Sequence, residues 1–273
     1  MNKGENMKSI AVIGYGSLGK ILTSVIIKQL AQEYTLAGIY DCAMEAATVE
    51  IEGKTVKMFA NFDEILTSDA EIVVEIAGVN AVNEMILPLL EAGKDVVITS
   101  VGALSDNELL TSITQQADIN GCKVHITSGA VGGFDILSTI SLMGNAVTSI
   151  ESTKAPKSLN GAPYLKGKDL PIDRCKLVFE GNASEAIRGF PKNTNVAVAT
   201  GLASGCVSQV AVRVISNPSA MGNTHRITIE NDNAKAVVEV TAKADSKNPK
   251  SSVTAAWSVV ALLKNLANPI QLF

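Results

Sequence analysis

Cysteine, histidine and aromatic side chains are scarce in this chain of 273 residues. The four cysteines are scattered, with no Cys-x-x-Cys pair and no Cys/His cluster at the spacing of metal ligands. We therefore expect reduced thiols, a cytoplasmic location and no bound metal. The two histidines, His125 and His225, are the candidates for acid–base chemistry near neutral pH, because the unperturbed pKa of histidine is about 6.5.

Basic stripes and strongly apolar spans are also lacking, and we expect no secretory leader. Lysine and arginine do not cluster among aromatic residues, and the formal net charge is −4, which argues against a nucleic-acid partner. The N-terminus enters a strand and a glycine turn without the apolar segment of a signal peptide. Glycine, serine and glutamine dilute the longest uncharged run, Thr194 to Val212, so it predicts a buried helix at a domain or subunit interface and not a membrane span.

Aliphatic residues are abundant, and their spacing predicts two domains. Hydrophobic residues make up 47% of the chain and aromatic residues 4%, a balance typical of parallel strands covered by helices. Through about residue 128, short β-branched runs alternate with helix-length segments, the βαβ rhythm of a parallel sheet. The middle, roughly 130 to 245, has a glycine-rich entry, a loop at 154–168 and alternating strands, and predicts a mixed α+β domain. A final helix is expected over about 251–266.

A glycine-rich turn follows the first apolar strand and opens a helix. Its sequence is Gly14-Tyr15-Gly16-Ser17-Leu18-Gly19, the G-x-G-x-x-G pattern in the strand–turn–helix context that gives it meaning. Gly14 permits the tight turn, Gly16 lets the backbone approach a pyrophosphate, and Gly19 lets helix and strand pack closely. The positive end of the helix, at Ser17 and Leu18, faces the phosphate charge. The turn predicts a Rossmann-type domain that binds NAD or NADP, and hence a dehydrogenase.

Asp41 ends the second predicted strand, about 20 positions beyond the glycine turn. A carboxylate there can accept hydrogen bonds from the ribose hydroxyls of NAD. The following Cys42-Ala43-Met44 offers no arginine for the 2′-phosphate of NADP. The alternative is an ordinary turn residue at the end of a strand. Asp41 therefore favours NAD, with NADP as the second choice.

Two further pairs of small residues follow the next apolar strands. Ala77 and Gly78 come after one strand, and Ser100 and Val101 come after the next. Because open α/β sheets bind their ligands at the carboxyl ends of the strands, we expect both pairs to line the nicotinamide half of the cofactor site. The alternative is that small residues merely form strand-to-helix turns.

Six ordered sequence blocks give the chain a family resemblance. They are GYGSLG (14–19), KDVVITSVGAL (94–104), SGAVGGFDIL (128–137), FPKNTNVAVATGLA (190–203), GNTHRI (222–227) and NPKSS (248–252). In these blocks the chain resembles the L-aspartate dehydrogenases, NAD(P)-dependent enzymes with a Rossmann domain and an α+β catalytic domain. The first two blocks also suit dihydrodipicolinate reductases and homoserine dehydrogenases, whereas the last four point to aspartate dehydrogenases.

The resemblance implies a catalytic histidine at His225 and cofactor contacts at Ala130 and Asn195. Oxidation of an amino group needs a base for the nitrogen proton and again for the attacking water, and a histidine near its ordinary pKa suits both steps. His225 follows a small polar run that can deliver its side chain into a cleft, and the alternative from the residues alone is a histidine packed where a loop meets a strand. His125 lies inside a predicted strand, where we interpret it as a packed, hydrogen-bonded histidine.

The resemblance also implies how the domains are assembled. The chain is expected to return after its second domain and to pack its last helix on the Rossmann half. Residues 1–129 and 249–273 would then form the dinucleotide-binding domain, and residues 130–248 the catalytic, substrate-binding and dimerisation domain. A homodimer is expected from the family and from the long uncharged segment at 194–212.

A dicarboxylate substrate needs cationic or amide partners, because an unpaired buried anion is costly. Lys154 and Lys192 are the candidate cations, with solvated loop charges as the alternative for both. Asn193 and Asn223 supply amides that can orient a substrate, or else cap and turn the backbone.

Reversible oxidation of L-aspartate to oxaloacetate and ammonia, through iminoaspartate, is the leading hypothesis for the function. Iminoaspartate that escapes hydrolysis would be available for NAD biosynthesis. The alternatives are a reductase of a related imine or semialdehyde and, more remotely, a non-catalytic NAD(H)-binding redox sensor, since a fold alone does not fix a function.

Overall fold

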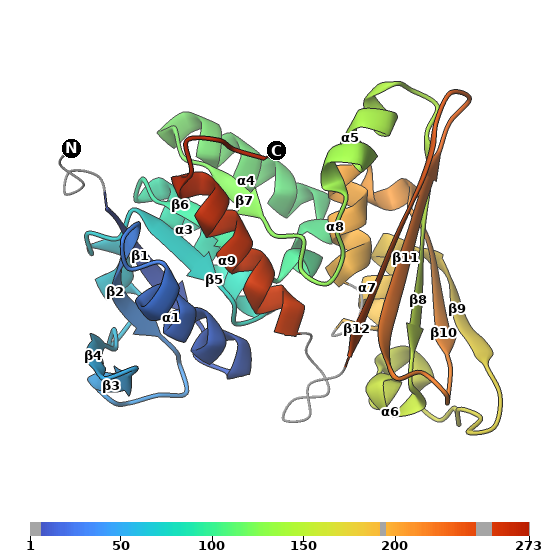
Figure 1. Cartoon of the computed structure of the whole chain (residues 1–273), viewed down its shortest axis with the longest axis horizontal. Helices are drawn as coiled ribbons and strands as arrows, with labels where there is room; N and C mark the ends of the chain where they lie inside the picture. Colours follow the sequence, from blue (N-terminus) through green and yellow to red (C-terminus); the bar gives the residue numbers. More distant parts are fainter. Residues whose placement is uncertain (1–6, 192–194, 244–252, 273) are drawn as a thin grey trace. The chain divides into compact units, whose positions relative to one another are not determined.

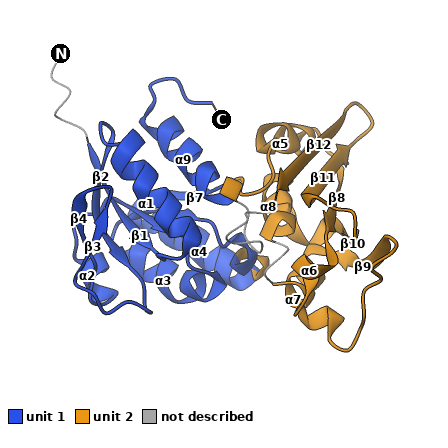
Figure 2. Cartoon of the chain, turned by 60° about the horizontal axis from the view of Figure 1, so that its bottom comes forward, with its two compact units in different colours: residues 1–103, 107–127, 255–273 blue, residues 104–106, 128–254 orange. Residues whose placement is uncertain are grey.

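The computed structural model describes residues 7–191, 195–243 and 253–272. These residues form two compact units (Figure 2). Unit 1 comprises residues 1–103, 107–127 and 255–273, and unit 2 comprises residues 104–106 and 128–254. Each unit has its own sheet, so the chain combines a parallel α/β part with a mixed α+β part, which is the predicted fold class.

Unit 1 is built on a five-stranded parallel sheet in the order β2-β1-β5-β6-β7. Its strands are β1 (Lys8–Ile13), β2 (Tyr34–Tyr40), β5 (Ile72–Glu75), β6 (Asp95–Ile98) and β7 (Val124–Ile126). The chain order reverses between β1 and β5, and ligands bind at such a switch point in open α/β sheets. The glycine turn follows β1 and the Ala77–Gly78 turn follows β5, so both lie at this point.

Helices cover both faces of the parallel sheet (Figure 1). They are α1 (Ser17–Gln29) and α9 (Val253–Ala267) on one face, and α3 (Val79–Glu91) and α4 (Asn107–Asn120) on the other. Leu22, Val25 and Ile26 of α1 recur at helical spacing and are buried with Val259 and Leu263 of α9 in one core cluster. The predicted return of the last helix to the Rossmann half is therefore confirmed.

A small hairpin and a short helix extend unit 1 beyond β2. They are β3 (Thr48–Ile51), β4 (Lys54–Lys57) and α2 (Asp63–Leu66). A bridge between Ile39 and Met58 ties this extension to the end of β2, where the ribose-binding residue is expected. After β6, a short 3₁₀ helix, η1 (Val101–Ser105), leads toward α4.

Unit 2 is built on a mixed five-stranded sheet in the order β12-β11-β8-β10-β9. Its strands are β8 (Val147–Lys154), β9 (Lys176–Asn182), β10 (Ala211–Ser216), β11 (Gly222–Glu230) and β12 (Lys235–Lys243). β10 runs parallel to β8, and the other pairs are antiparallel. The helices of this unit are α5 (Phe134–Leu142), α6 (Pro156–Leu159), α7 (Ala183–Gly189) and α8 (Asn195–Ala203), with the short 3₁₀ helices η2 (Pro163–Leu165) and η3 (Val207–Gln209).

Among the described residues of unit 2, helices cover one face of the sheet and leave the other, here called the open face, without a helix. In Figure 1, α5, α7 and α8 all lie on the same side of the strands. Burial alternates accordingly along β8, where Ile150, Ser152 and Lys154 are buried while Ser149 and Glu151 are partly exposed. The period of two along a strand therefore sorts functional candidates into two faces.

Two sequence predictions in unit 2 were wrong. The uncharged run 194–212 does not form one helix, because α8 ends at Ala203, Gly205 takes φ +82°, and β10 begins at Ala211. Lys154 is not a loop residue, because β8 continues to it and buries its side chain. The rest of the predicted loop at 154–168 holds two short helical turns, α6 and η2.

No helix among the described residues has the length and apolarity to cross a membrane. In the same residues, no group of three or more histidine, cysteine, aspartate or glutamate side chains is arranged to hold a metal ion.

Candidate functional site

The glycine turn after β1 leaves an open space in front of α1. Gly14 has φ +103°, and a Cβ on it would lie 2.9 Å from the backbone of Ala77. A Cβ on Gly19 would collide with the Gly14 carbonyl oxygen, whereas a Cβ on Gly16 would meet nothing within 4 Å. No side chain caps the N-terminus of α1, which begins at Ser17. Two glycines thus serve the fold, and the third keeps space beside a helix N-terminus, which fits the pyrophosphate of a dinucleotide.

Two backbone N–H groups hold the Asp41 carboxylate at the end of β2. Tyr15 N donates to Oδ2 at 2.7 Å, and Ala43 N donates to Oδ1 at 2.9 Å. The carboxylate is therefore anchored directly beside the glycine turn, at the expected place for a ribose partner.

A cavity of about 580 Å³ adjoins Asp41 in unit 1. Its walls come from the end of β2, the segment after it, the end of β4 and the start of α2, and are formed by Tyr40, Asp41, Cys42, Met44, Glu45, Ala46, Ala47, Lys57, Met58, Phe59, Ala60 and Glu64. The volume is typical of small-molecule pockets. Lys57 lies over the Phe59 ring and pairs with Glu64 at 2.9 Å, so its charge is already matched.

The carboxyl ends of β5 and β6 are joined by the buried carboxylate of Glu75, which the sequence prediction did not include. Its Oε1 accepts from Ala77 N, Gly78 N and Ser100 Oγ, each at 2.8 Å. Its Oε2 accepts from Ser100 N at 3.0 Å and from Thr99 N at 3.2 Å. Burial raises the pKa of Glu75, and the N–H donors oppose that shift.

Four buried polar side chains gather on the covered face of the unit 2 sheet. They are Ser152 and Lys154 on β8, Ser216 on β10 and His225 on β11. The register pairs His225 with Ser152 and Ser216 with Lys154, and Ser152 Oγ lies 2.8 Å from His225 Nδ1. The Oγ of Ser216 is buried and has no partner among the described residues. None of the four side chains is more than 5% exposed, so they form a compact polar cluster in an otherwise apolar layer.

Lys154 and His225 differ in charge near neutral pH, although burial lowers the pKa of both. Burial lowers the pKa of Lys154 to about 8, and no carboxylate in the described part of the chain pairs with it. Burial, with a further contribution from the Lys154 charge, lowers the pKa of His225 to about 3. Near neutral pH the cluster thus holds a neutral imidazole beside a buried ammonium that lacks an anion.

The remaining predicted residues lie at several places. Val101, buried, begins η1 in unit 1, while partly buried Ala130 lies in the turn before α5 and Asn195 begins α8 in unit 2. Asn223 is two residues before His225 on β11 and therefore shares its face of the sheet. Lys192 and Asn193 lie outside the described residues.

His125 lies in β7 of unit 1, separate from the unit 2 cluster. Burial lowers the pKa of its ring. It is a strand residue, as the sequence predicted.

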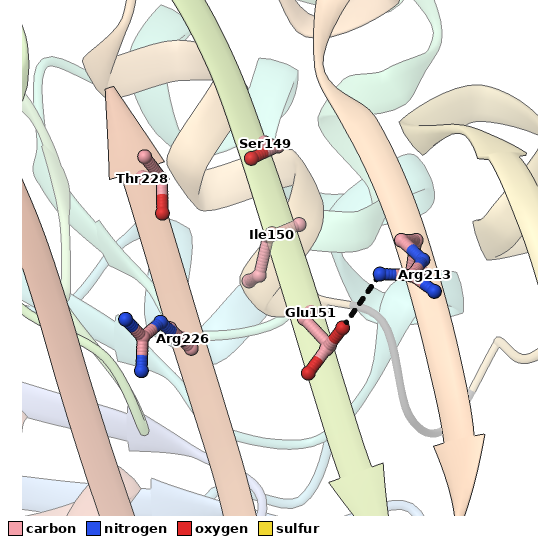
Figure 3. A pocket seen from close by; sticks show the side chains of 6 residues that line it. All are labelled: Ser149, Ile150, Glu151, Arg213, Arg226 and Thr228. Atoms are coloured by element: carbon pink, nitrogen blue, oxygen red, sulfur yellow. Dashed lines mark hydrogen bonds and ion pairs between the residues drawn. The ribbon is translucent and has the colours of Figure 1, made fainter. Parts of the chain in front are cut away.

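A second cavity, of about 330 Å³, lies on the open face of the unit 2 sheet (Figure 3). It is lined by Ser149, Ile150, Glu151, Arg213, Arg226 and Thr228. Arg213 donates to Glu151 at 3.0 Å, and Arg226 pairs with Glu239 at 3.2 Å. Because side chains alternate along a strand, this cavity is on the opposite face from His225 and is not part of the buried cluster.

Comparison with known proteins supplies the family. A family model described as the C-terminal part of aspartate dehydrogenase matches residues 135–266, and one described as the NAD-binding domain of homoserine dehydrogenase matches residues 14–127. An L-aspartate dehydrogenase of Methanococcus maripaludis is 33% identical over 97% of this chain and 99% of the relative. One of Methanosarcina acetivorans is 34% identical over the same shares. The chain belongs to the aspartate dehydrogenase family.

Solved structures agree with this family membership. Aspartate dehydrogenase from Thermotoga maritima superimposes with a TM-score of 0.76 and 28% identity, covering 98% of this chain and 100% of that one. A hyperthermophilic archaeal homoserine dehydrogenase in complex with NADPH matches with a TM-score of 0.58 and 13% identity over 96% and 98%, which shows a shared fold alone. The family and its NAD-binding domain establish a nicotinamide cofactor for this chain, and the glycine turn fits one.

Several residues around the two sites escaped the sequence prediction. Glu75 interrupts an apolar strand with a charge, and that signal was sufficient to mark it. Ser152 and Ser216 carried no such signal, because serine is ordinary on a strand. Lys57 and Glu64 are brought to Asp41 by the hairpin and α2, which local sequence does not reveal.

Proposed function

We propose that this chain is an L-aspartate dehydrogenase that oxidises L-aspartate, through iminoaspartate, to oxaloacetate and ammonia, with NAD as its preferred cofactor. The buried, unpaired ammonium of Lys154 beside the neutral imidazole of His225 carries the proposal. A buried cation without a partner is costly, and a substrate carboxylate would offset that cost. The names of the relatives, L-aspartate dehydrogenases, supply the amino acid.

In the proposed reaction, Lys154 binds a substrate carboxylate and His225 moves protons. The bound nicotinamide ring supplies the hydride acceptor. The neutral ring of His225 accepts a proton from the substrate nitrogen and releases it to solvent after hydride transfer. It then accepts a proton from the water that attacks the imine and returns that proton to the nitrogen that leaves as ammonia. Two negative charges on the substrate would also counter the effect of Lys154 on His225 and raise the low pKa of the imidazole.

Ser152 decides which nitrogen of His225 is available. If Nδ1 carries the proton and donates to Ser152 Oγ, Nε2 has a free lone pair and can act as the base. We propose this tautomer for the active form. Ser152 then acts as a positioning residue, and Ser216 and Asn223 on the same face are further candidates for substrate contacts.

In unit 1, Asp41 supports the preference for NAD. Its anchored carboxylate can accept from ribose hydroxyls and would repel a 2′-phosphate. The cavity beside it also contains Glu45, and its lysine is already paired with Glu64. We expect Asp41→Ser to weaken NADH binding and to bring the affinities for NADH and NADPH closer together. Titration followed by cofactor fluorescence measures both affinities. An equal loss of affinity for the two cofactors would contradict the ribose role.

Turnover tests the proposed function. NADH and NADPH absorbance would be followed with oxaloacetate plus ammonium, for wild type and for His225→Ala, with cofactor binding measured separately. We expect oxidation by wild type and a 10²- to 10⁴-fold loss in kcat, typical of a lost acid–base residue, at unchanged NADH affinity. If wild type binds NADH and oxidises none, the assignment fails; turnover of a semialdehyde instead would favour the homoserine dehydrogenase relatives.

We also propose that the protein is a homodimer that works in the cytoplasm. The uncharged run at 194–212 gives no support, because Ala197, Val198 and Ala199 are buried within unit 2 itself. Support comes from the open sheet face, where acidic and basic side chains alternate and Val147 is 71% exposed. Four free thiols support the compartment. Light scattering should give twice the chain mass for wild type and a lower mass for Arg213→Glu; a monomeric wild type would refute the dimer.

A further inference from the structure

Glu75 is a buried carboxylate placed where two cofactor-facing turns meet. It ends β5, is 0% exposed and has no ion-pair partner in the described part of the chain. One oxygen holds the turn from β5 to α3 through Ala77 N and Gly78 N. The other holds the start of the turn after β6 through Thr99 N and Ser100 N. A single side chain therefore joins two segments that are about 25 residues apart in sequence.

The donor set favours the ionised form of this carboxylate. Each oxygen accepts two backbone N–H bonds, and a backbone N–H can only donate. A proton on either oxygen would displace one of those bonds. The oriented amide dipoles and Ser100 Oγ thus oppose the rise in the pKa of Glu75 that burial causes, without help from a cation among the described residues.

The same two turns border the switch point of the sheet. A Cβ on Gly14 would lie 2.9 Å from the backbone of Ala77, so the glycine turn packs directly against the first segment that Glu75 fixes. The second segment contains Ser100, whose hydroxyl is used by Glu75. Displacement of either turn would change the edge of the sheet at which we expect the nicotinamide half of the cofactor.

We propose that Glu75 is a positioning residue that locks the β5–α3 and β6–η1 turns into one rigid platform for the nicotinamide half of the cofactor. This inference rests on the proposed function for the identity of the ligand. We place the adenosine half at the glycine turn and Asp41, to which none of the hydrogen bonds of Glu75 described above is made. Loss of the Glu75 carboxylate should therefore weaken binding of the nicotinamide half and leave binding of the adenosine half nearly unchanged.

The test compares NADH with ADP-ribose, which lacks the nicotinamide. In Glu75→Gln, one side of the group becomes an NH₂ that faces backbone donors, so at least one turn is released. We expect NADH to bind tenfold or more weakly, by fluorescence titration, while ADP-ribose binds within twofold of wild type by calorimetry. Amide hydrogen exchange should quicken at Ala77, Gly78, Thr99 or Ser100.

Two further variants keep the test decisive. Lys94→Met removes another buried charge of the same sheet, whose Nζ donates to Ser68 O and Ala70 O at the opposite, amino end of β6. It should lose stability without a selective effect on NADH. If Glu75→Gln does not fold, Ser100→Ala removes one bond of the network and should weaken NADH about threefold while sparing ADP-ribose.

Several outcomes would overturn the proposal. Equal weakening of both ligands would show general damage to unit 1, and unchanged NADH affinity in folded Glu75→Gln would show no role in the platform. A selective loss of NADH in Lys94→Met would show that any buried charge has the same effect. The measurement here is cofactor binding and does not require turnover. If wild type did not turn over oxaloacetate and ammonium, the proposed function would fail, but the comparison of NADH with ADP-ribose could still be interpreted.

Discussion

Lys154 combines a cost in stability with a gain in binding. Its ammonium is buried without a carboxylate partner, so replacement by methionine removes a charge and keeps most of the packing. We expect Lys154→Met to raise the free energy of unfolding at pH 7 by about 1–4 kcal/mol, the range seen when buried ion pairs are replaced by apolar groups. Urea unfolding measures this. Lys157→Met, at an exposed position three residues on, should change little.

The same lysine should govern the response to alkaline pH. The folded pKa of about 8 lies below the ordinary value of 10.5, so between these values the unfolded chain binds more protons. Stability should therefore rise with pH across this window, while affinity for oxaloacetate falls as the ammonium loses its proton. Both trends should be absent in Lys154→Met. Identical slopes in the two proteins would mean that Lys154 does not carry its charge in a buried site.

Ser152 should matter for catalysis more than for binding. Its hydroxyl lies 2.8 Å from His225 Nδ1 and fixes the ring that we propose as the base. A hydrogen bond of about 1–1.5 kcal/mol corresponds to roughly a tenfold change in rate. We expect Ser152→Ala to lower kcat about tenfold at unchanged NADH affinity, and Thr153→Ala, on the open face, to leave kcat unaltered. A loss confined to KM would assign Ser152 to substrate binding instead.

At the scale of elements, different glycines of the β1–α1 turn should affect stability and cofactor binding. A Cβ on Gly19 collides with backbone, whereas a Cβ on Gly16 enters open space. Gly19→Ala should therefore lower the melting temperature sharply, and Gly16→Ala should melt like wild type yet bind NADH at least tenfold more weakly. Calorimetry and fluorescence titration give both quantities. Normal NADH binding by Gly16→Ala would show that the pyrophosphate does not bind at this turn.

Helices and strands were predictable from the sequence where their buried residues are apolar. The parallel strands of unit 1 are continuous aliphatic runs, and the glycines after β1 marked the site directly. β8 is different, because its covered face carries Ser152 and Lys154 beside Ile150. Polar residues on a buried face erase the alternation that identifies a strand, so Lys154 looked like a loop residue. The polar residues that we propose for the site thus hid the strand from prediction.

Contacts between distant segments were beyond local reading. The run at 194–212 contains no charged residue that would indicate where its helix ends and its strand begins. Gly205, with a positive φ, follows the end of α8, but the sequence alone does not show that the helix stops there. The network of Glu75 joins two strand ends, and the pairing of Lys57 with Glu64 depends on a hairpin. Such sets follow from the order of strands in the sheet, which sequence periodicity leaves open.

For the whole molecule, the return of the chain from unit 2 completes the core of unit 1. Leu263 of α9 is fully buried among residues of β1 and α1, and its carbonyl accepts from the Tyr34 phenol at 2.8 Å. Leu263→Ala should cost about 2–5 kcal/mol of unfolding free energy, as large core truncations do. Leu272→Ala, 82% exposed beyond the helix, should cost little. Denaturant unfolding compares the two.

This dependence predicts how unit 1 behaves alone. A fragment of residues 1–127 lacks α9 and would expose the apolar face of α1 and the sheet, so we expect it to remain unfolded or to aggregate. Joining residues 253–272 to its end by a flexible linker should restore folding and NADH binding, because the core cluster would again be complete. Circular dichroism and NADH fluorescence would follow both fragments. A folded, NADH-binding fragment without α9 would show that the returning helix covers the Rossmann domain without being required for it.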